Sequence, residues 1–183
     1  MKYLDLPAGR EPPVDVNVIV EIPFGGTPIK YEVDKQSGLL FADRFLQAAM
    51  FYPGNYGYIP QTLSEDGDPC DVLIAGHVPI TPGAVVRCRP VGALLMEDEH
   101  GPDEKIIAVP VDGVQATSAA VRSMDDLPLG YRDQVAHFFQ HYKDLERGKW
   151  VKIGEWLDAD AAGALIMRAI DRAAGPHSGG LSS

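Results

Sequence analysis

Three aspartates lie within six residues of one another, in the segment DGDPCD at positions 66–71. Because Gly67 and Pro69 favour a turn, the sequence predicts one loop that carries all three carboxylates. Hard divalent cations such as Mg²⁺ bind oxygen ligands, and a cation between clustered carboxylates relieves their mutual repulsion. The segment therefore suits a metal site, while a solvated acidic turn is the alternative that uses the same residues.

A calcium loop of the EF-hand type is a further alternative for this segment. Such a loop needs a glycine at its sixth position and a glutamate at its twelfth. With Asp66 as the first position, these places hold Asp71 and His77, so the EF-hand is excluded.

A second acidic segment, MEDEHGPDEK at positions 96–105, lies between two predicted strands. Alone, it is typical of a charged hairpin loop. If both acidic loops lie at one end of a barrel, however, Asp98 and Asp103 complete a metal cluster begun by the three aspartates of the first segment.

Basic and phenolic side chains of the kind that bind phosphate are spread along the chain. Arginine binds phosphate through two parallel hydrogen bonds, lysine supplies a point charge, and a tyrosine hydroxyl donates a neutral hydrogen bond. Each also has an ordinary explanation as a surface ion pair, a core aromatic or a charge at a helix C-terminus. The candidates are Lys30, Arg44, Tyr52, Tyr56, Tyr142 and Lys143.

The first half of the chain is predicted to be rich in strands, which must bring these residues together. Apolar residues alternate with other residues in a two-residue period, and glycines and prolines separate the alternating stretches. In the stretch from Ile29 to Val33 this period places Lys30 and Glu32 on one face of a strand. The predicted strands cover residues 16–21, 29–33, 72–75, 85–96 and 106–111.

Two helices are predicted in the second half of the chain. One apolar stripe of helical spacing covers residues 131–142, behind an acidic start at Asp125 and Asp126. A second stripe covers residues 162–173. The predicted caps of this second helix are Asp158 or Asp160 at its start and Gly175 at its end.

Short strands followed by two helices indicate a mainly β fold, either a small barrel or a sandwich with the helices against one side. The chain has 183 residues, which suits a single domain, predicted here over residues 1–174. The Gly- and Ser-rich residues 175–183 are predicted to form a flexible tail.

Composition and charge argue against several classes of partner. The 16 Lys and Arg residues face 26 Asp and Glu residues, for a net charge of −10, which disfavours nucleic acid and anionic membranes. No apolar run approaches the roughly 20 residues of a membrane helix, and residues 1–15 lack the apolar stretch of a signal peptide. Cys70 and Cys88 have no metal-ligand spacing, so two reduced thiols in a cytoplasmic protein are expected.

Four segments together resemble the soluble family I inorganic pyrophosphatases in their short bacterial form. The most specific feature is the pattern DxDPxD after YPxNYGYIP, here within positions 52–71. The resemblance extends over residues 15–174, nearly the whole chain. The four segments are residues 20–35, 41–74, 87–110 and 137–156.

This resemblance implies a five-stranded closed barrel of OB type with two α-helices packed against it. It also implies that pyrophosphate is hydrolysed to two orthophosphates by direct in-line attack of a metal-activated water, without a phosphoenzyme. Several Mg²⁺ ions per active site are the implied cofactors, and other divalent cations can substitute. The implied assembly is a homohexamer.

The resemblance also implies roles for individual residues. Asp68 would orient and deprotonate the attacking water, a role that suits a carboxylate beside cations. The implied metal ligands are Asp66, Asp71, Asp98, Asp103 and Glu32. The implied substrate-binding residues are Lys30, Arg44, Tyr56, Tyr142 and Lys143, of which Lys30, Arg44 and Tyr56 would also be catalytic. Glu21, Tyr52 and Lys105 would support the site.

Three other functions fit parts of the pattern. A barrel of OB type could bind single-stranded nucleic acid, but this needs a basic groove with exposed aromatic residues, and the predicted loops are acidic. A Ca²⁺-binding module without catalysis would gain stability from metal and release no phosphate. Among enzymes, a nucleotide phosphohydrolase is the nearest alternative, and offering ATP beside pyrophosphate separates the two.

Overall fold

The computed structural model describes residues 5–34 and 36–175, so most of the predicted tail lies outside the described residues. The structure is mainly β, with two α-helices, α1 (Tyr131–His141) and α2 (Ala159–Ala174). Two short 3₁₀ helices, Ala116–Ser118 and Met124–Asp126, precede α1. In the described part of the chain no helix is long and apolar enough to cross a membrane. The strands are β1 (Gly9–Glu11), β2 (Asp15–Ile22), β3 (Ile29–Val33), β4 (Leu40–Phe45), β5 (Asn55–Tyr58), β6 (Asp71–Ile74), β7 (Val85–Asp98), β8 (Gly101–Pro110) and β9 (Val151–Leu157).

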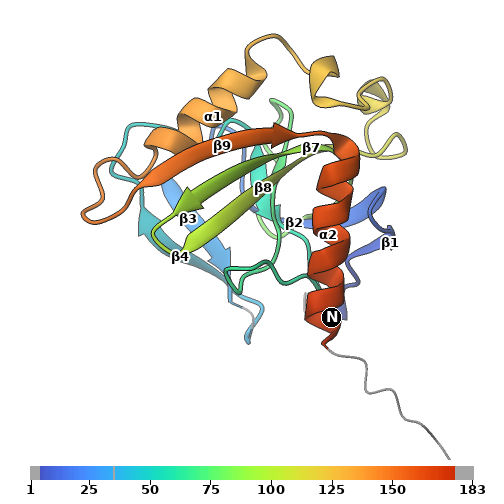
Figure 1. Ribbon diagram of the computed structural model, residues 1–183, viewed down its shortest axis with the longest axis horizontal. Helices are drawn as coiled ribbons and strands as arrows, with labels where there is room; N and C mark the ends of the chain where they lie inside the picture. Colours follow the sequence, from blue (N-terminus) through green and yellow to red (C-terminus); the bar gives the residue numbers. More distant parts are fainter. Residues whose placement is uncertain (1–4, 35, 176–183) are drawn as a thin grey trace, which may run out of the picture.

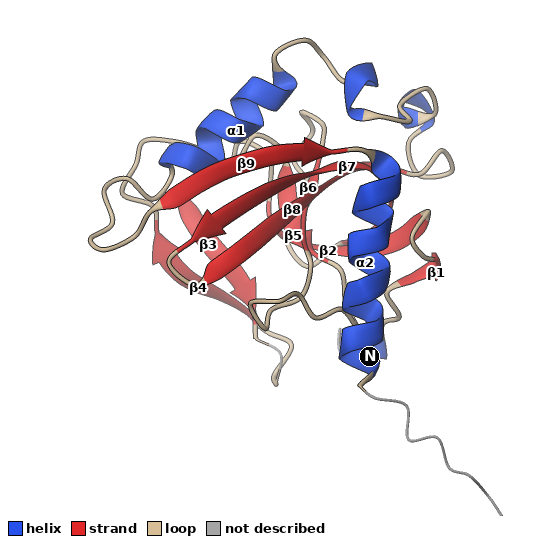
Figure 2. Ribbon diagram, viewed as in Figure 1, coloured by secondary structure: helices blue, strands red, loops and turns tan. Residues whose placement is uncertain are grey.

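Five strands pair with one another in a ring (Figure 1). They follow the order β2, β5, β6, β8 and β7, and β7 returns to β2, where Val18 lies opposite Val86. Within the ring only β6 and β8 run parallel to each other. β1 extends the sheet from β2, and β9 extends it from β7 (Figure 2). The mainly β fold with two helices is confirmed, while the OB type of the ring stays a prediction.

The sequence pattern missed four of the described strands, β1, β4, β5 and β9, and it did not foresee how β3 pairs. Residues 29–33 do form β3, but this strand pairs with β4 in a separate two-stranded sheet. Its place in the ring belongs to β5, whose four residues are too few to show a two-residue period. β9 also escaped prediction, because Gly154 and Glu155 interrupt its alternation of polar and apolar residues.

Strands buried on both faces divide the interior into two hydrophobic clusters. In β6, Val72 and Ile74 belong to one cluster and Leu73 to the other, as the two-residue period of a strand requires. α2 closes the first cluster with Ile166, and α1 closes the second with Phe138 and other aromatic residues. The two predicted apolar stripes therefore cover different hydrophobic clusters, and not one side of the fold as the sequence pattern predicts.

The start of α1 lies later than predicted. Asp125 and Asp126 belong to the separate 3₁₀ helix, where the Asp126 carboxylate accepts a hydrogen bond from the Ser123 amide at 2.9 Å. α1 begins only after Gly130, whose φ of +79° interrupts the helical backbone. The caps of α2 follow the prediction, because the Asp158 side chain accepts a hydrogen bond from the Ala161 amide and Gly175 ends the helix.

Gly57 of β5 is expected to tolerate no side chain. A Cβ atom at this position would lie 1.9 Å from the carbonyl oxygen of Ile19 on the neighbouring strand β2. We expect Gly57→Ala to lower the free energy of unfolding by about 3 kcal/mol, because β2 and β5 must separate. Urea unfolding measures the loss, and Gly113→Ala is the control, because its added Cβ would meet no atom within 4 Å. Equal midpoints for the two variants would contradict the prediction.

Candidate active site

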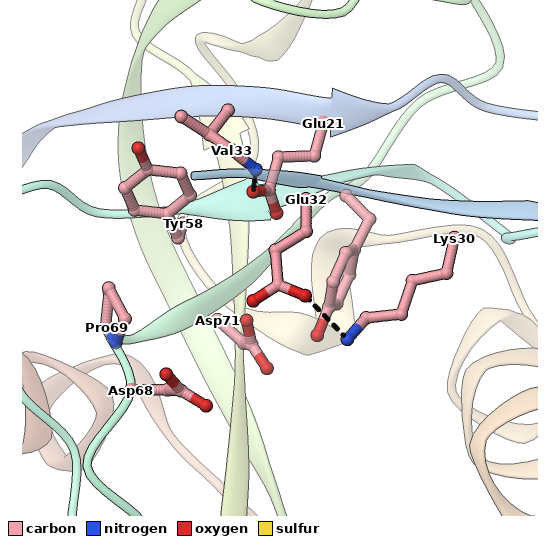
Figure 3. A pocket seen from close by; sticks show the side chains of 9 residues that line it. Glu21, Lys30, Glu32, Val33, Tyr58, Asp68, Pro69 and Asp71 are labelled. Atoms are coloured by element: carbon pink, nitrogen blue, oxygen red, sulfur yellow. Dashed lines mark hydrogen bonds and ion pairs between the residues drawn. The ribbon is translucent and has the colours of Figure 1, made fainter. Parts of the chain in front are cut away.

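All the predicted site residues line two adjoining cavities. The larger cavity, of about 370 Å³, is lined by every predicted site residue except Glu21. Glu21 lines the smaller cavity, of about 70 Å³, together with Lys30, Glu32, Tyr56, Asp68 and Asp71, which the two cavities share (Figure 3). We therefore treat the two cavities as one site.

The hairpin of β3 and β4 supplies the basic side of the site. Lys30 and Arg44 lie directly opposite each other in the register of the two strands. Lys30 Nζ lies 3.5 Å from Glu32 Oε2, as Figure 3 shows, which confirms that Lys30 and Glu32 share a face of β3. Arg44 also contacts the nearly buried side chain of Glu146, whose Oε1 lies 3.3 Å from Arg44 Nε.

Three aspartates come from the loop between β5 and β6, which carries Asp66 and Asp68, and from Asp71 at the start of β6. The Asp66 carboxylate accepts a hydrogen bond from the Asp68 amide at 2.9 Å, so the loop is folded back on itself. Figure 3 shows the carboxylates of Asp68 and Asp71 pointing into the cavity on the side of Glu32. Burial raises the pKa of Asp66 and outweighs the hydrogen bond from the Asp68 amide, and the nearby charges of Asp68 and Asp71 add to the rise.

Lys105 of β8 is buried between two of the acids. Its ammonium group donates hydrogen bonds to the carboxylates of Asp71 and Asp103 and lies 5.9 Å from the ring centre of Tyr56. Burial alone would lower the pKa of Lys105, but the two carboxylates outweigh it and hold this pKa above its ordinary value. Lys105 therefore stays charged and compensates two acids in the interior.

Asp98 and Lys143 form a second buried pair. Lys143 Nζ donates to Asp98 Oδ2 at 2.6 Å, and the His100 amide donates to Asp98 Oδ1 at 2.8 Å. Burial would raise the pKa of Asp98, but the hydrogen bonds and the charge of Lys143 outweigh it and lower the pKa. This pair joins the turn between β7 and β8 to the end of α1.

Glu21 of β2 lies beneath the acidic groups. It accepts a hydrogen bond from the Val33 amide at 2.7 Å and is 6% exposed. Burial raises the pKa of Glu21 to about 8, and the charges of Asp71 and Glu32 add to this effect against the backbone hydrogen bond. Without a cation nearby, Glu21 therefore carries a proton at neutral pH.

Three tyrosines form the aromatic wall of the site. The ring centres of Tyr52 and Tyr56 lie 5.0 Å apart, and those of Tyr52 and Tyr142 lie 6.5 Å apart. Burial raises the pKa of each hydroxyl above its ordinary value. The hydroxyls are therefore neutral near pH 7 and can donate hydrogen bonds to an anion.

The larger cavity adds four residues to the site that the sequence did not single out. Glu99 and His100 lie in the second acidic segment, and Lys149 lies in the last of the four segments of family resemblance. Asp43 lies 3.6 Å from Lys30 Nζ, a contact that depends on the pairing of β3 with β4. The added residues are Asp43, Glu99, His100 and Lys149.

The acidic residues of the site have the oxygen ligands that a hard divalent cation needs, but lysine side chains lie between their carboxylates. Within residues 5–34 and 36–175, no three acidic, histidine or cysteine side chains gather closely enough to hold one ion. The reason is visible at Lys105, whose ammonium group lies between the carboxylates of Asp71 and Asp103. The donors are carboxylate oxygens, which Mg²⁺ prefers, so a bound cation would compete with these lysines for the same oxygens.

Known proteins match the chain along most of its length. A family model described as inorganic pyrophosphatase matches residues 18–174. The inorganic pyrophosphatase of Caulobacter vibrioides is 56% identical over 94% of this chain and 97% of its own. That of Escherichia coli is 53% identical over 94% of this chain and 98% of its own.

Solved structures agree with this similarity in three dimensions. The crystal structure of the inorganic pyrophosphatase from Thermus thermophilus superposes with a TM-score of 0.90 at 42% identity, covering 96% of this chain and 100% of that one. The structure of the inorganic pyrophosphatase from Coxiella burnetii gives a TM-score of 0.88 at 45% identity, covering 91% of this chain and 99% of that one. The chain therefore belongs to the family I inorganic pyrophosphatases, hydrolases that cleave pyrophosphate.

Proposed function

We propose that this chain hydrolyses pyrophosphate to two orthophosphates in a Mg²⁺-dependent reaction, by direct in-line attack of water without a phosphoenzyme. The observation that supports the proposal best is the single site in which acidic loops face basic and phenolic side chains. Phosphoryl transfer asks little covalent chemistry of a protein, since positioning and charge neutralisation account for most of its catalysis.

The carboxylates are proposed to hold the cations. Asp66, Asp71 and Asp103 would hold the tightest one, and Asp98 and Glu32 would hold ions that arrive with the substrate. When bound, Mg²⁺ supplies charge neutralisation of the phosphate oxygens and makes a nearby water more acidic. Glu21, Lys105 and Tyr52 are proposed to support the site without binding the cations.

The opposite wall is proposed to bind the phosphates. Lys30, Arg44 and Lys143 provide charge, and the neutral hydroxyl of Tyr142 donates a hydrogen bond. Tyr56 lies beside Asp71 in the smaller cavity and would contact the phosphate under attack. Lys143 now binds Asp98, so we propose that it turns from Asp98 to phosphate when a cation takes that carboxylate.

Asp68 is proposed to accept the proton of the attacking water. Its carboxylate points into the site from the exposed part of the loop (Figure 3). Asp68 can therefore orient a water between the acidic loop and the bound phosphate and take its proton as the oxygen attacks.

The charge of the site explains why an acidic protein would act on an anion. Of the seven proposed acids, Glu21 is protonated in the cation-free site, and the other six still outnumber the four bases, so the site repels pyrophosphate until cations bind and reverse the local sign. The acids are Glu21, Glu32, Asp66, Asp68, Asp71, Asp98 and Asp103, and the bases are Lys30, Arg44, Lys105 and Lys143.

The family resemblance also suggests the setting of the reaction. We infer a homohexamer, and exposed aromatic residues such as Phe45 (70% exposed) and Phe51 (54%) are available for contacts between subunits. We also infer a ring of OB type. Cys70 and Cys88 are buried free thiols, which agrees with a place in the cytoplasm.

The assay that tests the proposal measures orthophosphate released from pyrophosphate. We expect rapid release with Mg²⁺, complete loss when excess chelator is added, and recovery when Mg²⁺ is restored. ATP is the comparison substrate, and faster release from ATP would favour a nucleotide phosphohydrolase instead. No release with Mg²⁺, Mn²⁺, Co²⁺ or Zn²⁺ would refute the proposed activity.

A further inference from the structure

A buried hydroxyl interrupts the strand pairing at the base of the acidic loop. β5 and β6 pair up to Tyr58 and Asp71, and the next pair of residues along is Ile59 and Cys70. There the Ile59 amide donates to the Cys70 carbonyl at 3.0 Å, as in an antiparallel pair. The reciprocal bond is replaced by Thr62, whose Oγ1 accepts from the Cys70 amide at 2.9 Å and donates to the Ile59 carbonyl at 2.6 Å.

The Thr62 hydroxyl therefore stands where one backbone bond would otherwise form. Thr62 is 6% exposed, so its hydroxyl and the two backbone groups that it joins are withdrawn from water. Without the hydroxyl, the Cys70 amide and the Ile59 carbonyl must either lose a partner or move together. The first outcome weakens the base of the loop by leaving two buried polar groups unpaired, and the second displaces the backbone that leads directly into Asp71.

The rest of the loop is bonded to itself and to α2. The Ser64 amide donates to the Asp68 carbonyl at 2.6 Å, and the Gly67 amide donates to the Ser64 carbonyl at 3.2 Å. Three contacts to α2 fix the outer side. The Leu63 amide donates to the Ala169 carbonyl at 3.0 Å, Arg172 donates to the Leu63 carbonyl, and Arg172 Nη2 lies 3.6 Å from Glu65 Oε1. The Thr62 hydroxyl thus holds the inner end of the loop, where the backbone passes through Cys70 into Asp71.

We propose that Thr62 is a positioning residue that presents Asp66 and Asp71 to the divalent cation. The inference rests on the proposed function of these two aspartates as metal ligands. Thr62 touches neither substrate nor cation and acts only through the backbone of Cys70 and the loop. Outer partners that orient metal ligands in this way affect metal affinity more than their own contacts suggest.

Calorimetric titration of the full chain with Mg²⁺, without substrate, tests this inference. We expect Thr62→Val, which keeps the shape and removes the hydroxyl, to weaken Mg²⁺ binding by about tenfold or more. Thr62→Ser keeps the hydroxyl and is expected to stay within about threefold of the wild type.

Asn17→Ala is the control for a loss of stability alone. Asn17 is 7% exposed, and its side chain donates to the Pro7 carbonyl at 2.9 Å, so this variant also loses a buried hydrogen bond to the backbone. Its Mg²⁺ affinity should equal that of the wild type even where its melting temperature falls as far as that of Thr62→Val.

Two results would overturn the role of Thr62. One is unchanged Mg²⁺ affinity in Thr62→Val. The other is equal weakening in Thr62→Ser, a variant that retains the fold, since the hydroxyl would then not be the cause. Phosphate release by the wild type is measured separately, and its absence would instead refute the proposed function.

Discussion

Asp68→Asn is expected to lower kcat for pyrophosphate by about 10³-fold, because an amide cannot accept the proton that the attacking water gives up. The change keeps the size of the side chain and one of its oxygens, and Asp68 is an exposed residue of the loop. The hydrogen bond from the Asp68 amide to Asp66 is made by the backbone and survives the substitution. The loss should therefore appear in kcat and leave the fold and first-cation binding intact.

Phosphate release at saturating pyrophosphate and Mg²⁺ measures this effect, together with a calorimetric Mg²⁺ titration. Asp171→Asn is the matched control, since Asp171 is an exposed aspartate on α2 and its loss should leave kcat unchanged. Turnover at the wild-type rate in Asp68→Asn would remove Asp68 from its proposed role. A loss of kcat that came with an equal loss of Mg²⁺ affinity would instead assign Asp68 to the cation.

The residues of the site could be predicted from the sequence because most of them lie in compact local patterns. The three aspartates of the first loop are set by the spacing of DGDPCD, and a two-residue period suffices to put Lys30 and Glu32 on one face. The meeting of the two acidic loops follows from the parallel pairing of β6 with β8, where Asp71 lies beside Lys105. The family resemblance implied that these residues share one site, but no local pattern contains the strand pairing that brings them together.

The contacts that hold these residues in place could not be predicted in the same way. Asn55 accepts hydrogen bonds from the amides of Phe24 and Ile80 and donates one to the Val78 carbonyl, joining three distant segments. Nothing in the sequence near Asn55 distinguishes these partners from solvent. The Thr62 hydroxyl is hidden in the same way, since a threonine in a loop is ordinarily a surface residue.

The start of α1 was predicted wrongly although the preference of acidic residues for the first turn of a helix does hold in this protein. Acidic residues do favour the first turn of a helix, and Asp125 and Asp126 precede a clear apolar stripe. Ser123 and Asp126, however, form the hydrogen bonds of a capping box in a short 3₁₀ helix, and Gly130 separates that helix from α1. The capping pattern was real but belonged to a shorter helix.

Lys105→Met is expected to destabilise the cation-free protein by about 4 kcal/mol, the cost of leaving buried charge without its partner. Lys105 is 3% exposed and is the ammonium group between Asp71 and Asp103. Methionine fills a similar volume and leaves two carboxylates facing each other. A bound cation restores the missing charge, so Mg²⁺ should stabilise this variant more than it stabilises the wild type.

The direction of the pH dependence follows from Asp103. Its pKa is already raised by burial, against the opposing charge of Lys105, and removal of that charge raises the pKa further. A group whose pKa is higher in the folded than in the unfolded protein favours folding at low pH and loses that contribution as pH rises through the folded value. In chelator, Lys105→Met should therefore lose stability between mildly acidic and neutral pH more steeply than the wild type.

Urea unfolding in chelator and in excess Mg²⁺, each at two pH values, measures the whole prediction for Lys105→Met. Lys152→Met on β9 is the control, because Lys152 is exposed and its loss should change stability little in any of these conditions. A deficit of the same size with and without Mg²⁺ would mean that Lys105 acts only through packing. A variant as stable as the wild type in chelator would show that the two carboxylates need no internal cation, and the competition proposed between lysine and Mg²⁺ would fail with it.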